Sequence, residues 1–238
     1  MTEKIAAVGS FQTKEEFVYT TLRAAILHCE LPPGEKLVVD HLSTRLGTST
    51  IPIRTALQRL QAEGLVEIVP HTGAVVSGIS TSLVTEVFSM LEALESVAFS
   101  QAAKIVKAED LAGLQNILKQ MDQALKNRDS NLWSDLNSRY HREVAEITRM
   151  KLLIEFTHRT LDNWDRLRRY FFKQDPSNRL PLAQVEHRKM LELLRKGDEQ
   201  ALIAMVLRHN RKARDAYCKL LESAGMEGCN SPKKDPKP

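Results

Sequence analysis

The sequence predicts a mainly α-helical protein, in which an N-terminal winged helix-turn-helix domain with a small β-hairpin precedes a C-terminal all-α antiparallel helical bundle. Three observations support this prediction. Short helical segments and one pair of β-rich runs precede residue 80, almost only helical periodicity follows it, and short turns separate the helices. We expect a flexible N-terminus (1–12), a first domain (13–79), a second domain (80–225) and a disordered Pro/Lys-rich tail (226–238).

The first domain is expected to begin with a helix from Glu15 to Cys29. The stretch "LPPGEKL" ends it, because consecutive prolines and a glycine cannot continue a helix. Asp40 is placed to cap a short helix that ends near Leu46, and Gly47 makes the turn that follows. The expected core contacts of the first helix are Phe17, Leu22, Ala25 and Ile26.

The stretch "TSTIPIRTALQRL" predicts a second short helix from about Thr50 to Glu63. Pro52 suits a first helical turn, where its missing N–H costs nothing. Cap oxygens are available on Thr48, Ser49 or Thr50, and Gly64 stands where helices commonly end. Two β-rich runs, 65–69 and 74–77, then flank "PHTG", which predicts a hairpin with Gly73 at positive φ.

This order of elements is typical of a DNA-binding winged helix-turn-helix, whose second helix enters the major groove. Packing of the apolar residues leaves four polar side chains facing outward on the expected recognition helix: Thr50, Arg54, Thr55 and Gln58. His71, Thr72 and Gly73 form the tip of the wing, placed to reach an adjacent groove or phosphate. The alternative is an ordinary solvated helix face, but the following hairpin favours DNA binding.

The charge of the first domain favours only modest non-specific affinity for DNA. Residues 13–79 hold six Lys and Arg against seven Asp and Glu. The positive groups would have to be focused locally at Arg45, Arg54 and Arg59, because counterion release depends on the phosphates that these side chains neutralise.

The stretch "LRAAILHCELPPGEKLVVDHLSTRLGTSTIPIRTALQRLQAEGLVEIVPHTGAVV" closely resembles the DNA-binding domain of the GntR family of bacterial transcription regulators. The resemblance implies DNA contacts from Arg45, Ser49, Thr50, Arg54 and the wing. Thr50-Ile51 stands where the family usually has Arg-Thr, and Thr55 stands where it usually has Glu. These departures imply an operator sequence different from the usual one.

The second domain is expected to contain six helices, at about 81–106, 108–127, 130–149, 151–174, 178–196 and 198–223. Gly197 and Asp198 make a tight connection between the last two, as C-cap and N-cap. In this domain Asn137 and His141 share one helix face. His187 and His209 lie about 15 and 18 Å from the Gly197 turn, at 1.5 Å rise per residue, so an antiparallel pair brings the rings to nearly one level.

Imidazoles arranged in this way can bind Zn²⁺ or another metal that accepts nitrogen donors. The alternative is that these histidines are structural, as a lone histidine usually is. Asp135 is not expected to be a ligand, because six residues separate it from His141 and place it on another side of the helix.

The helical half resembles the FCD effector domain of the FadR subfamily, and its six helices resemble the VanR-type branch. Here "NSRYH" matches the family's "[DN]..FH" motif, and His187 and His209 match its two later histidines. The resemblance implies a divalent metal, Zn or Ni, held by Asn137, His141, His187 and His209. Asn137 replaces the usual Asp, so the ligands are neutral and the ion attracts an anionic effector more strongly. Leu91 stands where relatives have a carboxylate-binding arginine, which implies a different or less polar effector, or a pocket that relies on the metal alone.

The expected function is therefore a cytoplasmic, homodimeric transcription regulator that binds a palindromic operator and a small organic acid. Three scattered cysteines fit a reducing compartment without a disulfide framework, and no apolar run spans a membrane. Phosphate-binding loops and nucleophile motifs are not found, so we do not expect an enzyme. The alternative function is a metal-dependent hydrolase in which the three-histidine site activates water.

Overall fold

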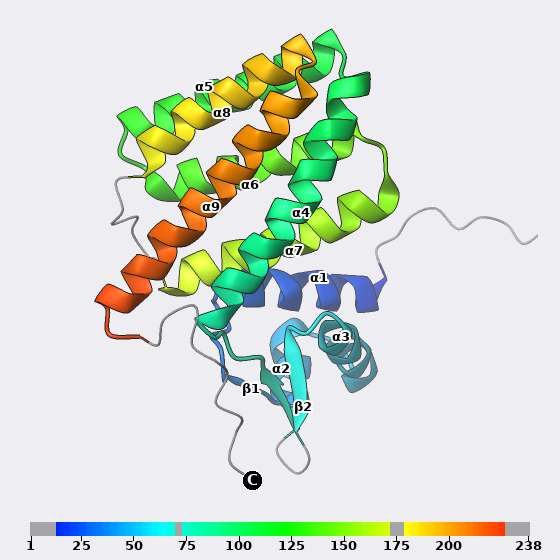
Figure 1. The fold of residues 1–238 in the computed structure, drawn as a ribbon. Helices are drawn as coiled ribbons and strands as arrows, with labels where there is room; N and C mark the ends of the chain where they lie inside the picture. The colour runs from blue at the N-terminus through cyan, green and yellow to red at the C-terminus, as the bar shows by residue number, and fades with distance from the viewer. Residues whose placement is uncertain (1–12, 70–72, 172–178, 227–238) are drawn as a thin grey trace, which may run out of the picture. The chain divides into compact units, whose positions relative to one another are not determined.

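The computed structural model describes residues 13–69, 73–171 and 179–226, and the chain divides into two compact units, Met1–Ile79 and Ser80–Pro238. The N-terminal unit contains α1 (Lys14–Leu27), β1 (Lys36–Leu37), α2 (Val39–Leu46), α3 (Thr50–Ala62), β2 (Val66–Val69) and β3 (Gly73–Val76). Its three strands form an antiparallel sheet in the order β1-β3-β2 (Figure 1).

The core of the N-terminal unit forms where α1 packs on α3 and α2 packs on α3. Val18, Leu22 and Ile26 of α1 are buried against Ile53 and Leu60 of α3. Phe17, expected in this core, is instead 46% exposed, because it lies one position away from the buried stripe of α1. The helix-turn-helix with a β-hairpin is confirmed.

Two predicted helix caps are wrong. Helix α2 begins after Val38, and Asp40 lies within its first turn, where only its backbone oxygen accepts a hydrogen bond from Thr44 Oγ1 (3.0 Å). Helix α3 begins after Ser49 without any side-chain cap, so Thr48, Ser49 and Thr50 do not supply one. Strand β1 was not predicted, because two residues are too few to show a period.

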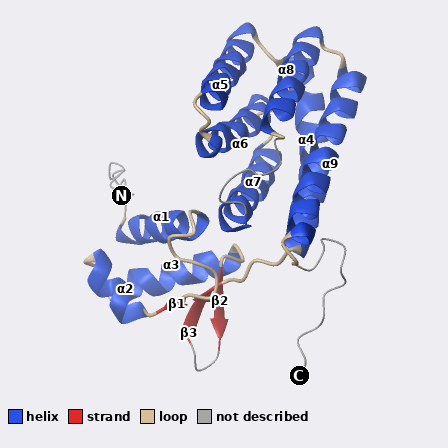
Figure 2. Ribbon diagram, turned by 90° about the vertical axis from the view of Figure 1, so that its left-hand side faces the viewer, coloured by secondary structure: helices blue, strands red, loops and turns tan. Residues whose placement is uncertain are grey.

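The C-terminal unit contains α4 (Ser82–Ile105), α5 (Ala108–Lys126), α6 (Ser130–Ile147), α7 (Lys151–Phe171), α8 (Leu180–Lys196) and α9 (Glu199–Ser223). Helix α4 packs against α6, α7 and α9, and α5 packs against α6 and α8 (Figure 2). Gly197 has φ 68° and ends α8, while the Asp198 carboxylate accepts a hydrogen bond from the Ala201 N–H, as expected. The predicted ends at 172–174 and 178 lie outside the described residues.

Two observations bear on the expected surroundings of the chain. None of the described helices is long and apolar enough to cross a membrane. Cys218 is disulfide-bonded, whereas Cys29 takes part in no disulfide. This bond was not predicted, because an odd count of scattered cysteines without C-x-x-C spacing indicates no pairing.

Candidate nucleic-acid interface and metal centre

Helix α3 presents one buried face and one polar face. Pro52, Ile53, Ala56, Leu57 and Leu60 are buried in the core of the N-terminal unit. Ser49, Arg54 and Gln58 are exposed, and Thr50 and Thr55 are half-buried. The Thr55 hydroxyl donates to the Ile51 backbone oxygen (3.3 Å), so part of its hydrogen-bonding capacity serves the helix. The structure therefore brings these predicted DNA-contacting residues to one side of α3.

The three expected cations of this unit are exposed but differ in their contacts. Arg45 and Arg54 are exposed, and neither forms an ion pair with the part of the chain that the structure describes. Arg59 instead lies 2.7 Å from Glu16 Oε2, and its guanidinium carbon lies 3.6 Å from the centre of the Tyr19 ring. This exposed ion pair joins α3 to α1. The expected role of Arg59 in focusing positive charge toward DNA stays a prediction.

The wing is described only in part. Gly73 has φ 94° and begins β3, which agrees with the expected positive φ. His71 and Thr72 lie outside the described residues.

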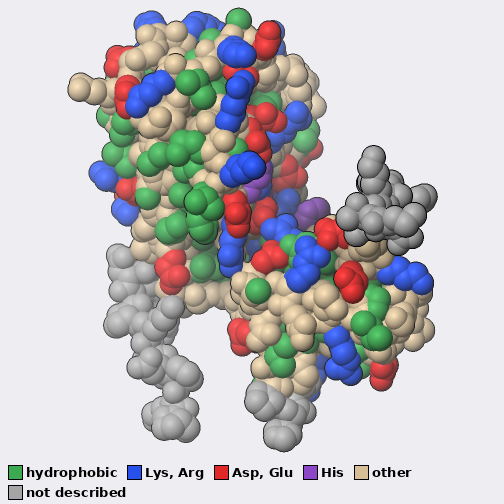
Figure 3. All heavy atoms as spheres, turned by 90° about the vertical axis from the view of Figure 1, so that its right-hand side faces the viewer, with side chains coloured by type: hydrophobic (Ala, Val, Ile, Leu, Met, Phe, Trp, Pro, Cys, Tyr) green, Lys and Arg blue, Asp and Glu red, His purple; other side chains and the backbone are tan. Residues whose placement is uncertain are grey.

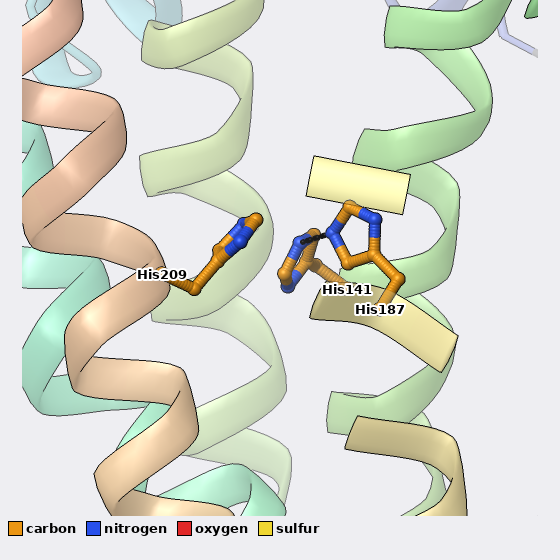
Figure 4. A group of neighbouring side chains, drawn as sticks. All are labelled: His141, His187 and His209. Atoms are coloured by element: carbon orange, nitrogen blue, oxygen red, sulfur yellow. Dashed lines mark hydrogen bonds between the residues drawn. The ribbon is translucent and has the colours of Figure 1, made fainter. Parts of the chain in front are cut away.

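Three buried imidazoles meet inside the C-terminal unit (Figure 4). His141 comes from α6, His187 from α8 and His209 from α9, and one nitrogen of each lies within 4.8 Å of the others. The two Nε2 atoms of His141 and His187 are 3.2 Å apart. The structure thus places together the three histidines that sequence spacing put at one level.

Two buried glutamates hold the outer edges of these rings. Glu95 Oε1 lies 2.9 Å from His141 Nδ1, and Glu186 Oε2 accepts a hydrogen bond from His209 Nδ1 (2.8 Å). Because an ionised carboxylate only accepts, His209 carries its proton on Nδ1 and its Nε2 keeps a free lone pair. Carboxylates behind histidines orient the rings of metal sites in this way.

Electrostatics keep both glutamates ionised. Burial alone would raise the pKa of Glu95, but His141 and the hydrogen bond from Asn210 Nδ2 (2.8 Å) outweigh burial and lower it. Burial also acts to raise the pKa of Glu186, and the hydrogen bond from His209 with nearby Lys212 and Arg179 lowers it to about 2.

Burial favours the neutral form of two of the histidines, His187 and His209. Burial lowers the pKa of His187 well below its usual value, and the nearby His209, His141 and Arg179 lower it further. Burial also lowers the pKa of His209, despite its hydrogen bond to Glu186. Neutral imidazole is the form that binds metals.

These residues fit a divalent metal ion. Two nitrogens bound to one ion at about 2.0–2.1 Å lie about 2.9–3.4 Å apart in tetrahedral or octahedral geometry, and the His141–His187 contact of 3.2 Å falls in that range. The buried Nδ1 atoms of His187 and His141 have no hydrogen-bond partner of good geometry among the described residues, although Glu95 Oε1 lies 2.9 Å from that of His141.

A cavity of about 50 Å³ adjoins the histidines. Asn137, one helical turn before His141, is half-buried and lines it, as do His141 and His209. Asp135 is not on this wall; it pairs with Arg168 (2.8 Å) and Arg169 (2.9 Å) on α7. Leu91 lines the cavity and adds apolar surface.

Arg179 and Glu95 are two charged residues of the cavity that the sequence analysis does not predict. The guanidinium of Arg179 is buried, and its NH2 donates to Glu186 Oε2 (3.0 Å) and to the His209 backbone oxygen (2.9 Å). Nothing in the local sequence marks it, because it immediately precedes α8 outside any apolar period. Glu95 carried a signal, as a charged residue within the apolar stripe of α4.

Known proteins resemble both units. The family model described as "Bacterial regulatory proteins, gntR family" matches residues 14–76, and the FCD domain model matches residues 86–212, more than half of the chain. An uncharacterized HTH-type transcriptional regulator of Agrobacterium vitis, from the TAR-I ttuE-ttuC' intergenic region, is 34% identical over 130 residues, 53% of this chain and 76% of the relative.

Two further relatives extend over most of the chain. The HTH-type transcriptional repressor RspR of Escherichia coli K12 is 25% identical over 198 residues, 83% of this chain and 86% of the repressor. The structure of E. coli McbR/YncC superimposes with a TM-score of 0.74 at 20% identity, and covers 90% of this chain and 100% of that one. That structural likeness shows the fold.

Proposed function

The chain belongs to the GntR family of bacterial regulatory proteins and is a DNA-binding transcription regulator with an FCD domain, and we propose that a metal and a small organic acid in its C-terminal unit control its operator affinity. The single observation that carries the proposal is the convergence of His141, His187 and His209 beside a cavity. The family and its named relatives are transcription regulators and not enzymes.

We propose that the N-terminal unit reads DNA through Arg45, Ser49, Thr50, Arg54, Thr55, Gln58 and the wing residues His71, Thr72 and Gly73. The exposed positions of Arg45 and Arg54 support this, since arginine suits guanine edges and phosphates. A twofold homodimer would bind two half-sites of a palindromic operator. Repression is the mode that the relative RspR supports by its name.

We propose that the metal is Zn²⁺ or Ni²⁺, held by His141, His187 and His209, with Asn137 as a neutral fourth ligand. Nitrogen donors favour these ions. The metal supplies positive charge for an anionic effector. The two DNA-binding units of a dimer can take more than one arrangement. An effector that binds one arrangement more tightly shifts the population toward that arrangement. The change in the free energy of DNA binding cannot exceed the difference between the effector's binding free energies for the two arrangements.

The test of this function is DNA binding by the full-length protein. A duplex selected by the protein from a random-sequence pool is labelled, and its affinity is measured by fluorescence anisotropy. Arg54→Ala should weaken binding about tenfold or more, from a lost contact of about 1–3 kcal/mol. Arg195→Ala removes the same charge from an exposed position on α8 and should leave affinity unchanged. Equal affinity of Arg54→Ala and wild type would contradict the assignment of the recognition face.

A further inference from the structure

A large apolar side chain, Ile51, lies on the outward face of α3. Ile51 precedes Arg54 by three residues and Thr55 by four, and it precedes Gln58 by seven. Residues at these spacings share one face of a helix. The opposite face of α3 is buried in the core of the N-terminal unit. Ile51 therefore lies at the N-terminal end of the face that is proposed to meet DNA.

The exposed fraction of Ile51 is high for an isoleucine. At 69%, it is not exceeded by any other large apolar side chain of the described residues, and Leu152 on α7 equals it. The branched side chain also makes isoleucine a weaker helix former than leucine, glutamine or glutamate, so the helix itself gains nothing from it. Single exposed apolar side chains are common on protein surfaces, so the position of Ile51 has to indicate its role.

Ile51 belongs to the first turn of the proposed recognition helix. In a helix-turn-helix, the N-terminal residues of that helix contact the edges of the bases in the major groove. The Ile51 carbonyl accepts the hydrogen bond from the Thr55 hydroxyl (3.3 Å), and Pro52, the next residue, is buried. These contacts hold the backbone from which the exposed Ile51 side chain extends.

The base edges in the major groove offer isoleucine one kind of favourable partner. They present hydrogen-bond donors and acceptors, apart from the C5-methyl group of thymine. Covering a donor or acceptor with an apolar side chain removes its hydrogen bond to water without replacing it, which costs free energy. Covering the thymine methyl group instead removes two apolar surfaces from water, which is favourable.

We propose that Ile51 is a specificity-determining residue whose side chain contacts the C5-methyl group of a thymine in each half-site of the operator. This inference rests on the proposed DNA-binding function and names a base that the recognition face selects. Arg54 lies about one helical turn further along the same face. An apolar contact and a charged contact are therefore neighbours on the helix.

Replacement of thymine by uracil tests the contact, because uracil keeps the base pair and lacks only the methyl group. Each thymine of the selected duplex is replaced in turn, symmetrically in both half-sites, and the affinity of the full-length protein is measured by fluorescence anisotropy. We expect replacement at one position to weaken binding about tenfold, since burial of a methyl group contributes about 0.8 kcal/mol in each of the two half-sites. Unchanged affinity at every thymine would overturn the inference.

Variants of Ile51 assign the thymine preference to its side chain. Ile51→Ala should lose most of the difference in affinity between the thymine and uracil duplexes, whereas Ile51→Val, which keeps a branched apolar side chain, should retain part of it. Leu152→Ala shortens an equally exposed side chain of the same size on α7 and should keep the full difference. A wild-type preference for thymine in Ile51→Ala would contradict the proposal.

Two further measurements on Ile51→Ala separate a base contact from other roles. The urea midpoint, followed by circular dichroism, should equal that of the wild type, because the exposed side chain leaves the core untouched. The slope of log affinity against log salt concentration should also be unchanged, because isoleucine neutralises no phosphate. A lower urea midpoint or a shallower salt slope would show that Ile51 acts through the fold or through phosphate contacts instead.

The outcome is distinguishable from failure of the proposed function. If Arg54→Ala leaves the affinity for the selected duplex unchanged, the recognition face is wrongly assigned and the inference fails with it. If Arg54→Ala weakens binding as expected but replacement of thymine by uracil has no effect, the inference about Ile51 alone fails.

Discussion

At the residue scale, the C-terminal unit keeps two ionised glutamates in its interior, each paired with a histidine. Glu95 is 2% exposed and contacts His141, and Glu186 is 9% exposed and contacts His209. A buried carboxylate without partners would be protonated instead. The structure supplies their partners: Asn210 of α9 for Glu95, and Lys212 of α9 with Arg179, which immediately precedes α8, for Glu186. This arrangement brings one ring nitrogen of each of the three histidines within 4.8 Å of the others.

The buried histidines predict how stability depends on pH. The pKa of His187 is lowered far below its usual value of 6.5 by burial. The unfolded chain therefore binds more protons than the folded protein as pH falls below about 6.5, and the free energy of unfolding decreases in that range. The stability that these neutral rings provide is fully present above about 6.5. The Tm of EDTA-treated protein, measured from pH 7.5 to 5.5, should fall.

Two variants assign this slope to the buried site. His187→Asn should show a shallower dependence of Tm on pH, whereas His28→Asn, at an exposed position, should keep the wild-type slope. A flat profile in the wild type, or an unchanged slope in His187→Asn, would show that the buried imidazoles do not govern acid stability.

The site could be predicted in part, for a physical reason. The levels of His187 and His209 follow from helical rise and one tight turn at Gly197, so spacing was sufficient to bring them together. The charged residues that hold the histidine rings in place could not be found from helical spacing. Glu186 on α8 contacts His209 on α9, and Arg179 contacts the His209 carbonyl from the start of α8. No local periodicity in the sequence encodes such contacts.

At the element scale, glycines at positive φ fix the turns on which the helix order depends. Gly47 ends α2 at φ 61° and separates it from α3, with nothing within 4 Å of an added Cβ. Gly47→Ala should therefore lower the free energy of unfolding of the N-terminal unit by about 1 kcal/mol through backbone strain alone. Urea denaturation followed by circular dichroism measures this change.

A second glycine gives the matched control. Gly113 lies inside α5 at an ordinary helical φ, also with nothing near an added Cβ. Gly113→Ala should stabilise the protein by about 0.5–1 kcal/mol, because alanine is the better helix former. Changes of the same sign in both variants would contradict this assignment of backbone conformation.

The helices were predictable to within a few residues because their apolar periods are long and their ends carry Gly47, Gly64 and Gly197. Features that depend on only a few residues could not be predicted from the sequence. Strand β1 has only two residues and takes its conformation from pairing with β3. Asp40 was wrongly predicted to be a helix cap, because Asp also suits the first turn of a helix. There its negative charge interacts favourably with the helix dipole.

At the scale of the whole molecule, an operator-binding homodimer requires a surface that a second copy covers. Helix α4 exposes Met90 and Val97, which are seven residues apart and so share a face, at 46% and 44% exposure. Hydrophobic side chains also gather on one side of the C-terminal unit in the space-filling view (Figure 3). Large exposed apolar patches commonly mark interaction sites.

The double variant Met90→Glu/Val97→Glu should be monomeric in light scattering after size exclusion, whereas the wild type should be dimeric. Leu182→Glu/Val185→Glu alters another exposed apolar pair, on α8, and should leave the dimer intact. A monomeric wild type would remove the proposed dimer, and dissociation by the α8 pair alone would move the interface away from α4.

The central claim is that the three-histidine centre binds a metal, and calorimetric titration of Zn²⁺ into EDTA-treated, full-length protein tests it most directly. The account predicts one ion per chain in the wild type and binding at least a hundredfold weaker in His187→Ala. His158→Ala is the control, since His158 lies on α7 outside the centre, 3.4 Å from Glu146; it should bind as the wild type does. Absence of stoichiometric binding in the wild type, or equal affinity in His187→Ala, would contradict the claim.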